Sequence, residues 1–262
     1  MEKISIIGCG WLGLALAKSL LAKQYQVVGS TTSPDKIDSL SALGITPSLF
    51  QLNPMPEGNS FQTLFKSSTV FINIPPASRK NPPEYYREQI KYLKYLLNGS
   101  DEVKRVLFIS STSYYPNVDQ KVDENSLHDF EKGSSKAVVW AEQEISEVKQ
   151  QLIILRCGGL LGYDRIPGKY FAGKDTPGKE NPTNYIHRDD VIREAEDLLL
   201  KKEWPTIKNL VNPSHYAREK IMTAMAEKHD FAPPVWTRPF RTPTKTVCSL
   251  YDLKDLKEPL TY

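Results

Sequence analysis

The chain has 262 residues, 40% of them hydrophobic and 25% charged, with a formal net charge of +3, which suits one α/β domain with a smaller lobe attached. Such a small charge, with scattered basic residues and no basic stripe beside stacking aromatics, argues against a nucleic-acid partner. Three isolated cysteines and four dispersed histidines indicate neither a disulfide framework nor a metal site, so we expect a cytoplasmic protein.

The N-terminal segment joins a short apolar run to a glycine loop and then to a helical pattern. In the loop pattern G-x-G-x-x-G, Gly8 takes the tight turn, Gly10 lets the backbone approach a pyrophosphate, and Gly13 lets helix and strand pack closely. The pyrophosphate then lies at the positive end of the helix dipole, against free N–H groups. We predict a dinucleotide site that also includes Trp11 and Leu12; a glycine-rich turn without a ligand is the alternative.

The same apolar segment, residues 4–22, is also a candidate membrane span or secretory leader. Three glycines, Ser5, Lys18 and Ser19 interrupt it, whereas a span needs ~20 mostly apolar residues. A leader needs a more basic start and a cleavage site between small residues. We therefore expect no membrane partner.

Strand-like and helix-like patterns alternate along the chain. The predicted strands are residues 3–7, 25–30, 47–52, 69–74, 104–110, 152–156 and 208–212, and the predicted helices lie near 12–23, 34–43, 59–66, 83–98, 134–150 and 189–202. Such alternation predicts right-handed βαβ crossovers and a parallel sheet covered on both faces. The expected fold class is α/β, a doubly wound parallel sheet of the Rossmann type.

Regularity fails in two stretches: residues 157–187, which resemble a long loop rich in glycine and proline, and residues 230–246, which are rich in proline and aromatics. Long loops without secondary structure are usually functional or disordered. We assign residues 1–156 to an NAD(P)-binding Rossmann domain and residues 157–262 to a small C-terminal substrate lobe, from which residues 184–212 return to the Rossmann domain.

The end of the second predicted strand bears on the type of cofactor. NAD-binding proteins usually place an acidic residue about 20 residues after the glycine loop, where it holds the ribose hydroxyls. This chain has no acid there but has hydroxyls and a lysine that tolerate a 2′-phosphate, namely Ser30, Thr31, Thr32 and Lys36. We therefore expect NADP, with NAD as the alternative because the usual arginine is missing. The same stretch also suits a helix cap at Ser33.

Ligands of open α/β sheets bind outside the carboxyl ends of the strands. At those ends we expect Ile74, Pro75 and Ser110 to contact the cofactor. Ser110 opens the polar run S-S-T-S-Y-Y-P, residues 110–116, and Lys136 follows near the start of a helical pattern. Hydroxyls also mark strand ends that bind nothing, and Lys136 also suits an ordinary solvated first turn.

These motifs together resemble those of the extended and atypical short-chain dehydrogenase/reductases, specifically their bacterial nucleoside-diphosphate-sugar epimerase-like branch. Besides the glycine loop, five stretches are similar to family patterns: residues 110–116 to S-S-T-S-V-Y-G, 132–136 to Y-G-x-S-K, 155–162 to L-R-x-x-x-x-x-G, 185–191 to F-V-H-x-D-D-V and 245–248 to K-x-V-x. The resemblance covers nearly the whole chain. It implies a catalytic hydroxyl at Thr112 and a catalytic, cofactor-binding lysine at Lys136.

One position departs from the family pattern. The family's general acid/base is a tyrosine four residues before the lysine, and the lysine lowers the tyrosine pKa; this chain has Lys132 there. Either Tyr114 or Tyr115 supplies the phenol from the strand end, or the protein binds cofactor without ordinary redox turnover.

The resemblance implies an NAD(P)-dependent oxidoreductase or epimerase that acts at a hydroxyl or carbonyl carbon of a small-molecule substrate such as a nucleotide sugar. The alternatives are a non-catalytic NADP(H)-binding or redox-sensing protein and a structural partner protein that has kept the fold. Cys9 has two interpretations as well: a reactive thiol whose pKa the helix N-terminus lowers, or a small buried side chain. No residue pattern indicates an oligomeric state.

Overall fold

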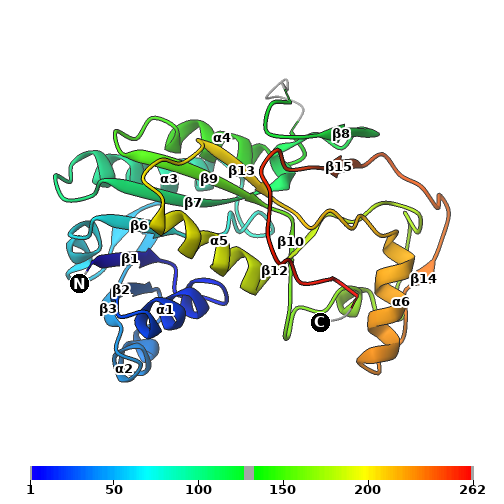
Figure 1. The fold of residues 1–262 in the computed structure, drawn as a ribbon, viewed down its shortest axis with the longest axis horizontal. Coiled ribbons are helices and arrows are strands. Elements are labelled where there is room, and N and C mark those ends of the chain that lie inside the picture. Colours follow the sequence, from blue (N-terminus) through cyan, green and yellow to red (C-terminus); the bar gives the residue numbers. More distant parts are fainter. Residues whose placement is uncertain (1, 127–132, 261–262) are drawn as a thin grey trace. The chain divides into compact units, whose positions relative to one another are not determined.

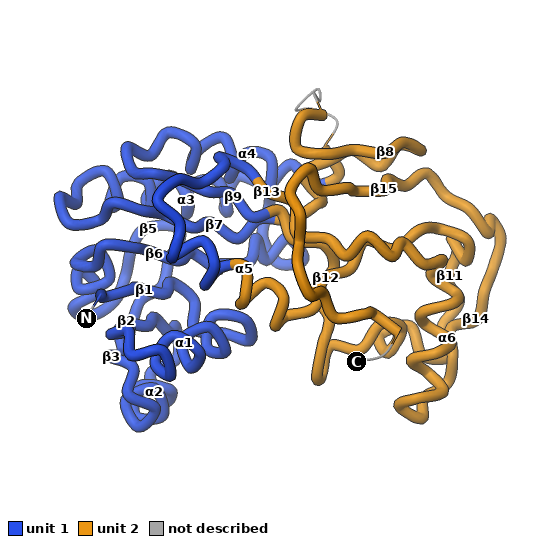
Figure 2. Tube along the Cα trace, in the orientation of Figure 1, with its two compact units in different colours: residues 1–110, 135–155, 195–207 blue, residues 111–134, 156–194, 208–262 orange. Residues whose placement is uncertain are grey.

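A computed structural model describes residues 2–126 and 133–260, which divide into two compact units (Figure 2). The first unit comprises residues 1–110, 135–155 and 195–207, and the second unit comprises residues 111–134, 156–194 and 208–262. The functional domain boundary expected at residues 156 and 157 stays a prediction.

A seven-stranded sheet forms the centre of the fold (Figure 1), in the order β13-β9-β7-β6-β1-β2-β3. Its strands are β1 (Lys3–Ile7), β2 (Gln26–Thr31), β3 (Thr46–Leu49), β6 (Thr69–Ile72), β7 (Arg105–Ser111), β9 (Gln151–Cys157) and β13 (Ile207–Leu210). Neighbours from β7 through β6, β1 and β2 to β3 pair in parallel. The strand order reverses between β1 and β6, as in a doubly wound sheet, so the expected fold class is confirmed.

Helices cover both faces of this sheet. They are α1 (Gly13–Ala22), α2 (Ile37–Ala42), α3 (Pro83–Asn98), α4 (Lys136–Ile145) and α5 (Arg188–Leu200). On one face, Ile72 of β6 joins a hydrophobic core with α3 and α4. On the opposite face, the next residue toward the N-terminus, Phe71, lies with Leu16 of α1 and Ala195 of α5. Burial on both faces explains why the central strands are almost wholly apolar.

The helix α3 has the bounds that the sequence predicts. Pro83 occupies the first turn, where its missing N–H costs no hydrogen bond, and Gly99 caps the C-terminal end. Its buried side chains recur at helical spacing along one face, at Tyr86, Ile90, Leu93 and Leu97. Local signals alone therefore define this element.

Three other predicted elements differ from the structure. The strand expected at 47–52 divides at Phe50, because the chain leaves the sheet after β3 and β4 (Gln51–Asn53) folds back on β5 (Met55–Glu57) in an antiparallel hairpin. The helix expected at 59–66 is the 3₁₀ helix η2 (Phe61–Phe65), and the helix expected at 134–150 is shortened to α4, since the chain already enters β9 at Gln151.

Within its described residues, the second unit contains three parallel two-stranded ladders and one further α-helix. The ladders pair β8 (Gln120–Val122) with β15 (Lys245–Val247), β10 (Gly159–Leu161) with β12 (Tyr185–His187) and β11 (Asp175–Thr176) with β14 (Val235–Trp236); the helix is α6 (Arg218–Lys228). The prediction of a long loop at residues 157–187 is therefore wrong. This stretch contains β10, β11, β12 and the 3₁₀ helix η5 (Lys169–Phe171). Among the described residues, no helix is long and apolar enough to cross a membrane.

Candidate functional site

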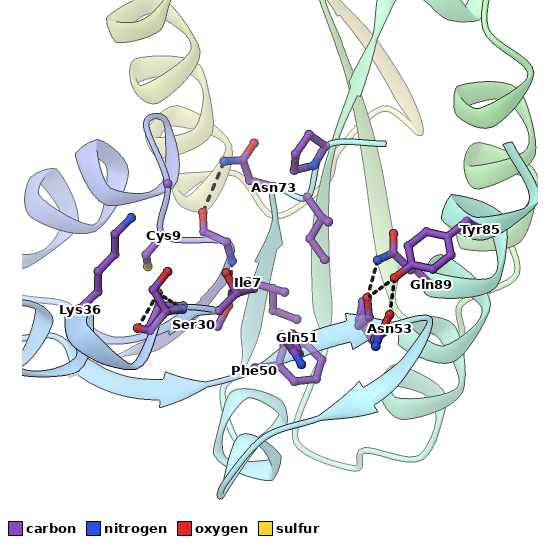
Figure 3. Close-up of a pocket in the computed structure, with 18 residues that line it drawn as sticks. Ile7, Cys9, Ser30, Lys36, Phe50, Gln51, Asn53, Asn73, Tyr85 and Gln89 are labelled. Carbon is purple, nitrogen blue, oxygen red and sulfur yellow. Dashed lines mark hydrogen bonds between the residues drawn. The ribbon is translucent and has the colours of Figure 1, made fainter. Parts of the chain in front are cut away.

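A cavity of about 570 Å³ lies in the first unit, at the carboxyl ends of β1, β2 and β6 (Figure 3). This is the point where the strand order reverses, which is the usual ligand position in doubly wound sheets. Its lining comes from the glycine loop, the end of β2, the β3–β4 turn, the end of β6 and α3: Ile7, Gly8, Cys9, Gly10, Ser30, Thr31, Thr32, Ser33, Lys36, Phe50, Gln51, Leu52, Asn53, Asn73, Ile74, Pro75, Tyr85 and Gln89.

The three loop glycines have separate geometric tasks. Gly8 has a φ of +101°, and a Cβ there would lie 2.4 Å from the carbonyl oxygen of Asn73. A Cβ on Gly13 would lie 2.2 Å from the carbonyl oxygen of Gly8, so helix α1 packs against the loop backbone itself. A Cβ on Gly10 would meet no atom within 4 Å. Packing therefore accounts for Gly8 and Gly13, and Gly10 alone borders open space.

Hydrogen bonds hold the loop in place from two strands. Ser30 accepts from the Gly8 N–H through Oγ at 2.8 Å and from the Cys9 N–H through its carbonyl at 2.9 Å. Asn73, just after β6, donates its backbone N–H to the Ile7 carbonyl at 2.9 Å and its amide Nδ2 to the Gly8 carbonyl at 3.4 Å. Sequence reasoning missed Asn73, although a lone amide in the apolar run 69–74 was a usable signal.

The residues expected to select the cofactor fall into two groups. Ser30 and Thr31 are buried, and the Thr31 hydroxyl accepts from the Ser33 N–H at 3.1 Å, so both side chains shape the loop. Thr32 and Lys36 are exposed and also line the cavity, with Lys36 at the end of the 3₁₀ helix η1 (Pro34–Lys36). Of the four residues expected to select the cofactor, Thr32 and Lys36 are therefore the two that are exposed at the cavity.

Sequence reasoning missed the far end of the cavity, where α3 meets β4 (Figure 3). Tyr85 donates its phenol to Asn53 Oδ1 at 2.9 Å, and Gln89, one helical turn later, donates Nε2 to the Leu52 carbonyl at 2.6 Å. The contacts join segments distant in sequence, which no local pattern reports. The expected residues Ile74 and Pro75 do line the cavity, whereas Trp11, Leu12, Gly13, Ser110 and Lys136 are not among the lining residues.

Cys9 is a packing residue. Its side chain is 7% exposed, and a Cβ on Gly29 would lie 2.5 Å from its Sγ. Burial raises the pKa of the Cys9 thiol to about 12, although a hydrogen bond involving the Ser30 backbone opposes the shift. The interpretation of Cys9 as a thiol activated by the helix N-terminus is therefore wrong, because it needs a lowered thiol pKa and burial raises that pKa.

The predicted catalytic residues are divided between the two units. Lys136 belongs to the first unit, as does the expected cofactor-binding residue Ser110, and Thr112, Tyr114 and Tyr115 belong to the second unit. The Ser110 hydroxyl donates to the carboxylate of Glu142, a buried residue of α4 that sequence reasoning missed. Lys136 is exposed at the first position of α4, and Lys132 lies outside the described residues.

The two adjacent tyrosines have different surroundings. Tyr115 is 0% exposed, and its phenol oxygen lies 3.0 Å from Arg156 Nη1, which donates to it, and 2.9 Å from Asn209 Oδ1. Burial raises the pKa of Tyr115, against the opposing effect of Arg156. Tyr114, at the end of the 3₁₀ helix η3 (Thr112–Tyr114), is only partly buried. Within the described residues, no group of three or more His, Cys, Asp or Glu side chains suits a metal.

Comparison with known proteins adds both sequence and structural matches. The model of the NAD-dependent epimerase/dehydratase family matches residues 4–169. Protein YeeZ of Escherichia coli K12 is 32% identical over 238 residues, which cover 89% of this chain and 86% of YeeZ. MoeE5 in complex with UDP-glucuronic acid and NAD has a TM-score of 0.72 at 18% identity, covering 94% of this chain and 90% of MoeE5. UDP-glucuronic acid 4-epimerase from Bacillus cereus in complex with NAD has a TM-score of 0.70 at 16% identity, covering 94% of this chain and 89% of the epimerase chain. At such identities the structural matches show the fold alone.

Proposed function

This chain belongs to the NAD-dependent epimerase/dehydratase family, and we propose that it is an NAD(P)-dependent oxidoreductase or epimerase acting at a hydroxyl or carbonyl carbon. The observation that carries the proposal is the backbone at Gly10, in the loop that leads into α1, where a Cβ would meet no atom within 4 Å and the residue lines the cavity. A pyrophosphate needs that close approach and benefits from the positive end of the helix dipole.

The cavity supports a position for each part of the dinucleotide. The pyrophosphate lies over Gly10 and the N–H groups of Trp11 and Leu12, and the adenosine half extends along β2 toward the β3–β4 turn. Thr32 and Lys36 then meet a ribose 2′-phosphate, and the Lys36 ammonium favours NADP over NAD. NAD is the alternative, since the two solved structures named above contain it.

The bound nicotinamide supplies a hydride acceptor or donor. In the first unit, Lys136 and Ser110 would hold the nicotinamide ribose. In the second unit, Thr112 would orient the reacting oxygen and Tyr114 would move the proton. Tyr115 is the weaker candidate for proton transfer, because its phenol is buried and held by Arg156 and Asn209. The second unit selects the substrate, for which a nucleotide sugar is the leading class.

A non-catalytic NADP(H)-binding protein is the second candidate function. The observation that favours it is Lys132, which stands where the family has its tyrosine. Incubation of NADPH with carbonyl compounds and nucleotide sugars separates the two functions, because only the enzyme consumes NADPH or interconverts the sugars.

Calorimetry with NADPH and NADH tests the cofactor site. We expect both to bind the wild-type protein, NADPH more tightly, and we expect Gly10→Ala to weaken binding at least about tenfold, a loss of ~1.4 kcal/mol. The added methyl meets no protein atom, so the thermal midpoint of the free protein stays unchanged. Absence of binding at millimolar cofactor would contradict the proposed function, and tighter binding of NADH would overturn the assignment of Thr32 and Lys36.

A further inference from the structure

Arg156, near the end of β9 in the second unit, places a positive charge against the two tyrosines that follow β7. Arg156 is only 3% exposed. The guanidinium carbon lies 3.4 Å from the centre of the Tyr114 ring and 5.0 Å from that of Tyr115. The guanidinium is therefore stacked on Tyr114, while it donates its hydrogen bond to the Tyr115 phenol at 3.0 Å.

Tyr115 anchors this arrangement. Its phenol oxygen is also within hydrogen-bond distance of Asn209 Oδ1, at 2.9 Å, and of the Asp123 carbonyl, at 3.0 Å. With no exposed surface and with donor and acceptor partners on its phenol, Tyr115 is poorly placed to exchange a proton with a substrate. Its role is to hold Arg156 in position.

Tyr114 is held between these groups and is more accessible. Its ring meets the Tyr115 ring edge-on, with centroids 5.6 Å apart and an interplanar angle of 90°. The backbone carbonyl that follows it, at Tyr115, accepts from Lys245 Nζ of β15 at 2.8 Å and from the Ser134 N–H at 3.2 Å. The ring of Tyr114 therefore has a defined place on the guanidinium.

We propose that Arg156 is the positioning residue that stabilises the Tyr114 phenolate, a task the family gives to a lysine beside its tyrosine. The inference rests on the proposed function. A positive charge within a few ångströms favours the charged form of an acid. In this role Tyr114 would take the hydroxyl proton of a substrate alcohol during oxidation and return it during reduction. The nicotinamide would accept the C–H electron pair as hydride when the C=O bond forms and give it back in the reverse direction.

Two cations among the described residues lie near the Tyr114–Tyr115 pair, and a nearby cation favours the ionised form of a phenol. Arg156 of β9 is stacked on the ring, and Lys245 of β15 lies at the Tyr115 carbonyl. On the other side of Tyr115, Glu124 accepts the Asn209 N–H at 2.7 Å and disfavours ionisation of Tyr115. Among the described residues, the Arg156 guanidinium is therefore a charged group in direct contact with the Tyr114 ring.

The test measures each phenol pKa directly, by the NMR titration of protein labelled with ¹³Cζ-tyrosine. Tyr114→Phe and Tyr115→Phe assign the two signals. We expect Tyr114 to titrate below the ordinary tyrosine value of about 10 because of the stacked guanidinium, and Tyr115 to titrate above it because of burial. Arg156→Gln raises the Tyr114 midpoint by about one unit, Arg156→Lys changes it less, and Lys174→Gln, which removes a cation stacked on Tyr170 in the same unit, leaves it unchanged.

A Tyr114 midpoint at or above the ordinary value in the wild-type protein overturns the proposal, whether or not the Arg156 variants fold. In Arg156→Lys, the pH at which turnover falls by half on the acidic side must shift by the same amount as the Tyr114 midpoint. A purely structural role of Arg156 would not produce this shift. Calorimetry with NADPH separates the two levels of inference. Failure of cofactor binding overturns the proposed function and this proposal with it, whereas intact binding with an ordinary Tyr114 pKa overturns the proposal alone.

Discussion

Lys245 brings a positive charge into the interior of the second unit. The residue is 7% exposed, and its ammonium donates to three neutral acceptors: the Tyr115 carbonyl at 2.8 Å, Asn117 Oδ1 at 2.8 Å and Ser134 Oγ at 2.9 Å. Burial lowers the pKa of Lys245 from 10.5 to about 8. The three hydrogen bonds orient the charge, but no carboxylate is among these acceptors to offset its desolvation.

The lowered pKa of Lys245 predicts stability that rises with pH. Between pH 8 and 10.5 the unfolded chain binds more protons than the folded one at this residue, so the free energy of unfolding increases across that window and is level below it. We expect the free energy of unfolding, measured with urea, to rise by ~2 kcal/mol across this window. This is less than the full pKa shift would give, because the hydrogen bonds favour the ammonium. Lys245→Met removes the gain, and equal pH profiles for the two proteins would contradict the prediction.

At the scale of elements, the close packing of α1 against β1 and the glycine loop depends on Gly13. A Cβ on Gly13 would lie 2.2 Å from the Gly8 carbonyl oxygen and 3.1 Å from Ile6 Cγ2. We expect Gly13→Val to fold but to lose ~2 kcal/mol of stability, about 4–8 °C in thermal midpoint, and to abolish NADPH binding because the loop must shift. Gly10→Ala is the matched control, which loses affinity without losing stability. An unchanged midpoint in Gly13→Val, measured by calorimetry, is the contrary outcome.

Elements with local signals could be predicted from the sequence, and elements with distant partners could not. The seven strands of the central sheet were identified from apolar runs, and α3 from Pro83, Gly99 and the spacing between them. The helix α6 was missed because it packs its buried face, which includes Met222, against residues from remote segments such as Phe171 and Trp236. The break at Phe50 was missed for the same reason, since the hairpin that follows it contacts α3.

The candidate site divides in the same way. The glycine loop and the end of β2 carry a local pattern, and the structure places Gly8, Gly10, Thr32 and Lys36 on one cavity. Asn73 could be read only as one polar residue in an apolar strand. Tyr85 and Gln89 line the cavity because α3 lies against β4, and the stacking of Arg156 on Tyr114 depends on two strands of the sheet. Such contacts are properties of the fold rather than of any window of sequence.

At the scale of the whole molecule, neither compact unit is a continuous piece of chain. Each is assembled from three stretches, and β9 begins in the first unit and ends in the second (Figure 2). Unfolding of either unit would therefore release one end of a strand whose other end belongs to the folded unit. We therefore expect the two units to unfold in one cooperative transition, even though every residue lining the cavity belongs to the first unit.

Cofactor binding tests that cooperativity. NADPH at 100 times its Kd stabilises the folded state by ~2.7 kcal/mol, and this gain must raise the unfolding midpoint of both units together. Trp11 and Trp236 report on the first and second unit respectively. In one variant Trp11 is the sole tryptophan, and in another Trp236 is, with the remaining tryptophans changed to Phe. Fluorescence midpoints that coincide without NADPH and shift equally with it support a single transition, whereas a shift confined to the Trp11 signal shows that the units unfold separately.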